Sequence, residues 1–173
     1  MKVTTWNGCY SNQWAGLIVP DAFSHPAKYS PGLIQTIYKH GIRNGYFKKG
    51  DLIADCFGGI GGGGIYAAYA GLRWVGCELE SKFIDLARQN FEINGPAWRA
   101  YGYPEPVIIQ GDSRRFSEIV GQVDCIATSP PYADSVNSEN HGIDLSKTRR
   151  DGDVRHQRMG QGNIEQLHYG KTK

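Results

Sequence analysis

Hydrophobic and polar positions between residues 51 and 128 follow two patterns that alternate along the chain. Short apolar runs of the kind that buried strands show occur at 51–55, 73–78, 107–110 and 123–128. Between them, apolar residues recur at helical spacing, at 65–70, at Phe83, Leu86, Ala87 and Phe91 after a capping Ser81, and at Phe116, Ile119 and Val120. Strands that alternate with helices indicate βαβ units, so the predicted fold class is α/β, a mainly parallel sheet with flanking helices.

The segments on either side of this region have a different character. Residues 1–24 are aromatic and polar without a clear period, which predicts an N-terminal arm. Ser30-Pro31 is typical of a helix start, with Ser as N-cap and Pro as first residue, and Gly41 is the expected helix end. We interpret 25–134 as the domain that carries the chemistry.

From residue 135 to residue 173 the chain is polar and has few large apolar residues. Its last part, 145–173, holds seven Lys and Arg residues and three acids, a net charge of +4. Such a segment cannot build its own core. We interpret 135–173 as a polar basic tail, either disordered or forming a loop that contacts phosphate.

Composition narrows the class of protein. The chain has 173 residues, which is typical of one domain, and 40% of them are hydrophobic. It has neither an apolar run of the roughly 18 residues that a membrane helix needs nor an apolar signal-peptide core, so we expect a cytoplasmic protein without a membrane partner. The four cysteines form no Cys-x-x-Cys pair and the five histidines have no ligand spacing, so we expect no metal site. Buried reduced thiols are predicted at Cys56, Cys77 and Cys125.

A glycine-rich segment follows the first predicted strand, where a helix begins. It reads Asp55-Cys56-Phe57-Gly58-Gly59-Ile60-Gly61-Gly62-Gly63-Gly64. Glycines there let the backbone approach a ligand, and the helix N-terminus offers free N–H groups, which favours a nucleotide-like cofactor. The spacing Gly59-x-Gly61-x-x-Gly64 also satisfies the dinucleotide fingerprint, so a nicotinamide cofactor stays an alternative.

Acidic residues follow the next two strands at what should be the same edge of the sheet. Glu78 ends the second strand, where a carboxylate can accept hydrogen bonds from both hydroxyls of a ribose. Asp112-Ser113 follows the third strand, where Asp112 can accept from an adenine amino group or cap a short helix. Ligands of open α/β sheets bind at this carboxyl edge, so we predict a cofactor site there.

The segment Thr128-Ser129-Pro130-Pro131-Tyr132 directly follows the fourth strand. Its two prolines fix φ and remove N–H donors, which predicts a rigid loop that presents acceptors beside the cofactor. Ser129 and the Pro130 carbonyl can accept the two N–H bonds of an exocyclic amino group. Tyr132 can stack on a base that has been flipped out of a helix.

These segments resemble the S-adenosylmethionine-dependent amino-methyltransferases of DNA. The cofactor loop of that family reads Asp-Pro-Phe-x-Gly-x-Gly, matched here with Cys56 in place of Pro, and its catalytic loop reads Asp/Asn/Ser-Pro-Pro-Tyr/Phe/Trp. The segment from His25 to Pro31 resembles the family segment that lines the methionine end of the cofactor, and Asp55 would receive the methionine ammonium. The resemblance implies S-adenosylmethionine-binding residues His25, Lys28, Asp55, Phe57, Gly58, Gly59, Gly61, Glu78, Asp112 and Ser113, and catalytic residues Ser129, Pro130, Pro131 and Tyr132.

The resemblance implies a Rossmann-like methyltransferase fold and methyl transfer to adenine N6 or cytosine N4 of DNA. Cytosine C5 chemistry is disfavoured because the chain has no Pro-Cys nucleophile. The family sheet has seven strands, whereas four are predicted here, so we expect an incomplete fold whose open edge could pair with a second copy or a complementing chain. Three alternatives stay open: an RNA amino-methyltransferase, a non-catalytic binding module and a nicotinamide-dependent oxidoreductase.

Overall fold

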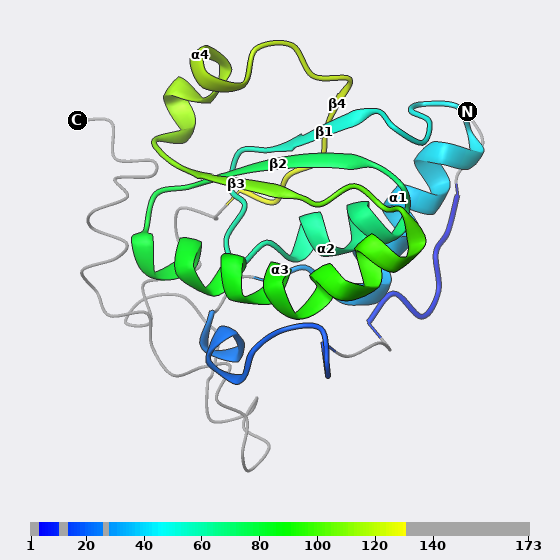
Figure 1. Cartoon of the computed structure of the whole chain (residues 1–173). Helices are drawn as coiled ribbons and strands as arrows, with labels where there is room; N and C mark the ends of the chain where they lie inside the picture. Colours follow the sequence, from blue (N-terminus) through cyan, green and yellow to red (C-terminus); the bar gives the residue numbers. More distant parts are fainter. Residues whose placement is uncertain (1–3, 11–13, 26–27, 131–173) are drawn as a thin grey trace, which may run out of the picture.

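Four parallel strands form the centre of the structure (Figure 1). The computed structural model describes residues 4–10, 14–25 and 28–130. Within these residues the strand order is β3-β2-β1-β4, and every pair is parallel. This confirms the predicted α/β class. The strands are β1 (Leu52–Asp55), β2 (Arg73–Glu78), β3 (Val107–Gln110) and β4 (Cys125–Ile126).

Helices cover both faces of the sheet. Figure 1 shows α1, α2 and α3 on one side and α4 on the other. The order of strands and helices along the chain is the predicted one. The helices are α1 (Pro31–Arg43), α2 (Gly62–Tyr69), α3 (Ser81–Tyr101) and α4 (Phe116–Val120), with short 3-10 helices η1 (Pro20–Ser24) and η2 (Ser113–Arg115).

Alternation along the strands divides the core into two clusters. Ile53 and Trp74 point to the side of α1, α2 and α3, where they join the larger cluster, and Trp74 is 2% exposed. Their neighbours Ala54 and Val75 point to the other side and pack with Phe116. Side chains of a strand alternate between faces, and each large apolar side chain fully buried contributes about 1.5–3 kcal/mol. Both faces of the two central strands, β1 and β2, are therefore buried, as is typical of parallel sheets, whereas Val107 of β3 and Ile126 of β4 in the outer strands are 53% and 61% exposed.

Helix α3 continues beyond Phe91, the last residue that its apolar spacing predicted, and contains Pro96. A proline inside a helix costs about 3 kcal/mol because it removes a hydrogen bond and crowds the preceding turn. Trp98 lies past it, is 0% exposed and packs against Phe91 and Tyr69 with ring centroids 6.0 Å apart in both cases. We infer that this burial offsets the cost of the proline.

Three predicted boundaries need small corrections. The N-cap of α3 is Glu80, and Ser81 is its first residue. Helix α1 begins at the predicted Pro31 but continues past Gly41 to Arg43. Gly41 does not end the helix; it makes room for the Phe47 ring, which would lie 2.1 Å from a Cβ at this position. Strand β4 is shorter than the predicted 123–128, although hydrogen bonds to β1 continue on either side, from the Asp124 N–H to Leu52 O and from the Ala127 N–H to Ala54 O (both 3.0 Å).

Part of the predicted N-terminal arm packs into the main core. Trp14, Ile18 and Ala22 are 6%, 4% and 0% exposed and belong to the larger cluster. The domain boundaries at 24 and 134 stay predictions, and the predicted tail 135–173 lies outside the described residues. All four cysteines are free, and Cys9 and Cys77 are buried. The predicted burial is therefore confirmed for Cys77, whereas Cys56 and Cys125 are only half-buried. In the described part of the chain, no helix combines the length and the apolar character that crossing a membrane requires.

Candidate cofactor and methyl-acceptor site

The glycine loop bends sharply between β1 and α2. Gly59 and Gly61 have φ values of +52° and +77°, in the left-handed region that favours glycine. Gly61 is the N-cap of α2, and a Cβ there would lie 2.5 Å from the Phe91 ring. The loop therefore needs glycine at 61 for both its backbone conformation and its packing on α3.

The Glu78 carboxylate at the end of β2 lies against this loop. Its Oε2 accepts a hydrogen bond from the Gly59 N–H at 3.1 Å, and its Oε1 accepts one from the Glu80 N–H at 3.0 Å. Burial raises the pKa of Glu78, and these backbone donors oppose the increase. A carboxylate has about four acceptor positions, so after these two bonds it retains the capacity to accept from both hydroxyls of a ribose. The predicted ribose role fits this geometry and stays a prediction.

Asp55, the last residue of β1, has a carboxylate that is buried under the loop. The residue is 1% exposed, and its Oδ1 accepts hydrogen bonds from the Phe57 N–H at 3.0 Å and the Thr128 hydroxyl at 2.7 Å. Its Oδ2 has no hydrogen-bond partner among the described residues. Burial raises the pKa of Asp55 to about 6, although both hydrogen bonds lower it. The structure shows Asp55 holding the loop, and its predicted contact with the methionine ammonium stays a prediction.

The segment before α1 approaches the loop from the side of α3. His25 is 7% exposed, lies edge-on against Phe83 with ring centroids 4.3 Å apart, and would be 3.2 Å from a Cβ at Gly59. The Lys28 ammonium donates to the backbone oxygens of Phe23 and His25. The structure thus brings His25, the first residue of the segment that resembles the methionine-end segment of the family, next to the glycine loop.

One small pocket joins this loop to the predicted catalytic loop. Ser129 lines it and is exposed, as is the following Pro130. Pro131 and Tyr132 lie outside the described residues, so their predicted roles stay predictions. The pocket is lined by Lys28, Tyr29, Phe57, Gly58, Ile60, Gly62 and Ser129.

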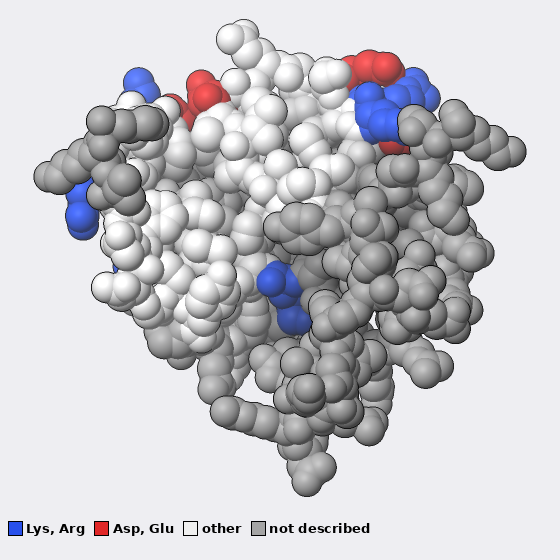
Figure 2. All heavy atoms as spheres, turned by 180° about the vertical axis from the view of Figure 1, so that it is seen from behind, with Lys and Arg blue, Asp and Glu red and all other residues white. Residues whose placement is uncertain are grey.

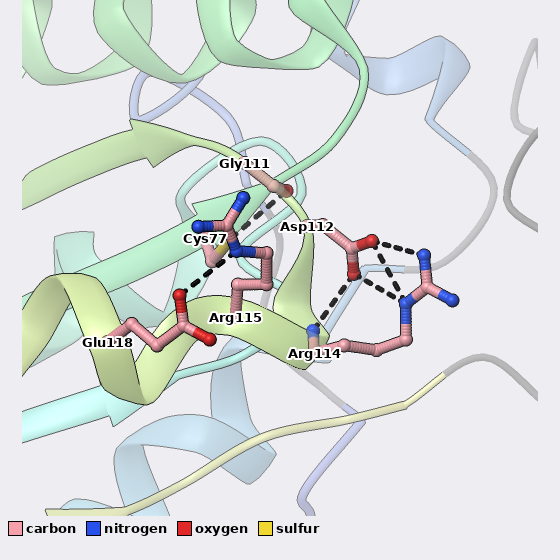
Figure 3. A network of polar contacts seen from close by, with 6 residues as sticks. All are labelled: Cys77, Gly111, Asp112, Arg114, Arg115 and Glu118. Atoms are coloured by element: carbon pink, nitrogen blue, oxygen red, sulfur yellow. Dashed lines mark hydrogen bonds and ion pairs between the residues drawn. The ribbon is translucent and has the colours of Figure 1, made fainter.

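Asp112 and Ser113 follow β3, where Asp112 is the N-cap and Ser113 the first residue of η2. Figure 3 shows the Asp112 side chain facing that of Arg114. Asp112 Oδ1 accepts from the Arg114 backbone N–H at 2.9 Å, and both carboxylate oxygens accept from the Arg114 guanidinium. These donors lower the pKa of Asp112 to about 2. The geometry matches the helix-capping alternative, because Arg114 occupies the acceptors that an adenine amino group would use. The adenine-binding role stays a prediction that requires Arg114 to move.

The residues fit an adenosine cofactor as a set. A tight glycine turn with left-handed φ values at Gly59 and Gly61, a half-buried acid at the end of β2, and a pocket that leads to Ser129 lie at the carboxyl edge of the parallel strands, where open α/β sheets bind ligands. Among the described residues, no group of three or more His, Cys, Asp or Glu side chains could hold a metal ion.

Two further residues support the site and were not among the predicted ones. Asn90 on α3 is 0% exposed; its Nδ2 donates to Ile60 O at 2.9 Å, and its Oδ1 accepts from the Val19 N–H at 2.8 Å. An asparagine on the apolar face of a helix is a signal that could have indicated such a buried polar link. Thr128 adjoins the predicted catalytic loop, but nothing in the sequence indicates its contact with Asp55.

Comparison with known proteins identifies first the fold and then the family. The structure of TrmN from Thermus thermophilus superimposes with a TM-score of 0.50 and 22% sequence identity, over 64% of this chain and 31% of that one. This shows a Rossmann-like methyltransferase fold. A family model described as DNA methylase, of the N6/N4 class, matches residues 3–89. The chain belongs to this family, whose members use S-adenosylmethionine as cofactor.

Curated relatives extend the similarity. The tRNA (guanine(10)-N2)-dimethyltransferase of Methanothermobacter thermautotrophicus is 29% identical over 145 residues, 82% of this chain and 38% of that protein. The tRNA (uracil(54)-C(5))-methyltransferase of Pyrococcus furiosus is 32% identical over 79 residues, 45% of this chain and 18% of that protein. The chain therefore spans well under half the length of these relatives. Family membership favours S-adenosylmethionine over the nicotinamide alternative.

Proposed function

We propose that this chain binds S-adenosylmethionine and serves in methyl transfer to an exocyclic amino nitrogen of a nucleic-acid base. The observation that carries the proposal is the pocket shared by Phe57 and Gly58 of the glycine loop and by Ser129 of the predicted catalytic loop. Membership of the DNA methylase family supports the same assignment.

The proposed roles of the site residues follow from their positions in the structure. The glycine loop, Glu78 and the segment from His25 to Lys28 would hold the cofactor, which supplies an electrophilic methyl group when bound. The Ser129 hydroxyl and the Pro130 carbonyl would accept the N–H bonds of the amino group and direct its lone pair toward that methyl group. Catalysis then comes from orientation and from placed acceptors, and no covalent enzyme intermediate is needed.

DNA is the substrate we propose first, with adenine N6 or cytosine N4 as target, because the matching family model describes DNA methylases. RNA is the second candidate, because a relative that covers 82% of this chain is named for N2 methylation of a tRNA guanine. That atom is also an exocyclic amino nitrogen. We also propose a cytoplasmic location.

The described surface supplies limited contact for phosphates on one face. Figure 2 shows charged side chains near the upper edges of this face and a basic side chain in its middle, while most of the remaining described surface is uncharged. Neutralising phosphates is the main source of nucleic-acid affinity. We therefore propose that other parts of the chain, such as the basic segment 145–173, or a complementing chain supply this contact. Strand β4 ends the described sheet and exposes Ile126 (61%), so pairing with a second copy is also proposed there.

Methyl transfer from labelled S-adenosylmethionine to unmethylated DNA and to unmodified tRNA tests the proposal. We expect transfer to one of them, with Ser129→Ala lowering kcat at least tenfold and Pro130→Ala lowering it further, while the Kd for the cofactor changes little. Ser117→Ala, an exposed serine on α4, is the matched control and should leave kcat unchanged. An equal loss of cofactor binding in the Ser129 variant would contradict the proposed division of roles.

A further inference from the structure

The two loops of the candidate site are joined by one side-chain hydrogen bond. The Thr128 hydroxyl donates to Asp55 Oδ1 at 2.7 Å, across 73 positions of sequence. Asp55 ends β1 and opens the glycine loop, whereas Thr128 lies beyond β4 and directly precedes Ser129. The bond therefore links the segment that cradles the cofactor to the segment that would hold the amino group.

This bond continues the pairing of two strands where their backbone ladder ends. Strands β1 and β4 pair through Ile53–Cys125 and Ala54–Ile126, and the Ala127 N–H donates to Ala54 O at 3.0 Å. The Thr128 hydroxyl makes the next contact along the chain. Strand β4 has only two residues in the ladder, so a side-chain bond at its end has a large share in fixing the position of the Ser129-Pro130 segment.

The acceptor of this bond is a buried carboxylate with few other donors. Asp55 is 1% exposed, its Oδ1 has one other donor, the Phe57 N–H, and its Oδ2 has none among the described residues. Hydrogen bonds to ionised acceptors are shorter and stronger than neutral ones, and a low dielectric strengthens them. The Thr128 hydroxyl is thus held at a defined place relative to the glycine loop.

We propose that Thr128 is a positioning residue for methyl transfer, whose hydroxyl holds the Ser129-Pro130 segment in register with the glycine loop through Asp55. The proposal rests on the proposed function for its catalytic meaning. Ser129 is the next residue along the chain and lines the pocket with Phe57 and Gly58, so a shift of Thr128 would displace the acceptor hydroxyl from the cofactor. Displacements of about 1 Å can cost a hundredfold in rate.

The test compares Thr128→Val, which keeps the shape and removes the hydroxyl, with Thr128→Ser, which keeps the hydroxyl. Thr36→Val is the matched control, because Thr36 donates to Gly32 O within α1, away from Asp55. The first readout is amide hydrogen exchange in the 173-residue chain without cofactor. We expect exchange of the Ala127 amide to rise at least tenfold in Thr128→Val and to stay near wild type in Thr128→Ser. Exchange of the Asp124 amide, which donates to Leu52 O at the other end of the same strand, should not change.

The second readout is kinetic. We expect kcat for methyl transfer to fall at least tenfold in Thr128→Val, with the S-adenosylmethionine Kd within about threefold of wild type, and to recover in Thr128→Ser. Unchanged Ala127 exchange, or an unchanged kcat in the valine variant, would overturn the proposal. A wild-type chain that neither binds S-adenosylmethionine nor transfers methyl would instead refute the proposed function, and the exchange result would still decide whether Thr128 holds the two loops in register.

Discussion

The buried carboxylate of Asp55 makes the stability of this fold depend on pH in a direction that can be calculated. Its pKa is raised from 3.8 to about 6, chiefly because burial disfavours the charged form. The native state therefore binds more protons than the unfolded state between about pH 4 and pH 6. Consequently, the contribution of Asp55 to the free energy of unfolding is largest at low pH and falls as the pH rises through this window.

Asp55→Asn removes this titration while keeping the shape of the side chain. A shift of about two pKa units corresponds to roughly 3 kcal/mol. We therefore expect the free energy of unfolding of the wild type, minus that of Asp55→Asn, to fall by about 3 kcal/mol between about pH 3.5 and pH 7.5. Any constant cost of placing an amide at this site cancels in the comparison between pH values.

Urea denaturation followed by tryptophan fluorescence at a series of pH values measures this difference. Asp85→Asn is the matched control, because the Asp85 side chain is 66% exposed on α3, and its curve should run parallel to that of the wild type. Parallel curves for wild type and Asp55→Asn would refute the reasoning, since they would mean that Asp55 titrates alike in the native and unfolded states.

Three further predictions concern the support of the site. Gly61→Ala should destabilise the fold by about 2–4 kcal/mol in urea denaturation, because it adds the clash with Phe91 to the cost of a left-handed φ. The control Gly45→Ala has a similar φ of +72° but open space around the new Cβ, so it should cost only about 1–2 kcal/mol. Equal losses of stability in the two variants would contradict this account. Asn90→Ala should cost about 2–4 kcal/mol by the same method, because it leaves buried backbone groups of the loop and of the N-terminal segment without partners; a loss under about 0.5 kcal/mol would argue against that role. Burial raises the pKa of the Cys77 thiol to about 11, so at pH 8 mass spectrometry should find Cys77 alkylated far more slowly than in the unfolded chain, and similar rates would refute its burial.

The parallel sheet could be predicted because its central strands are buried on both faces. Apolar runs such as the one within 51–55 then stand out against the polar and glycine-rich turns, and their alternation with helices implies the order of elements. The continuation of α3 could not be predicted, because Gly95-Pro96 reads locally as a helix end and only the burial of Trp98 overrides it. Burial of Trp14 in the main core was equally hidden, because its segment has no period.

Part of the candidate site could be predicted from the same rule. Residues that end neighbouring parallel strands meet at one edge, which brings Glu78 to the glycine loop and Ser129 to the same pocket as Gly58. The hydrogen-bond partner of each polar group could not be predicted, because partners far apart in the sequence meet only in the folded chain. The bond between Thr128 and Asp55 spans 73 positions, and the pairing of Asp112 with Arg114 depends on the conformation of η2.

Calorimetric titration of the 173-residue chain with S-adenosylmethionine tests the central claim most directly. The account predicts saturable binding at one site, weakened at least tenfold by Glu78→Ala and unaffected by Glu118→Ala, whose exposed carboxylate pairs with Arg115 on the other side of the sheet. Absence of binding by the wild type, or full affinity in Glu78→Ala, would contradict the claim that the glycine loop and the acid at the end of β2 form the cofactor site.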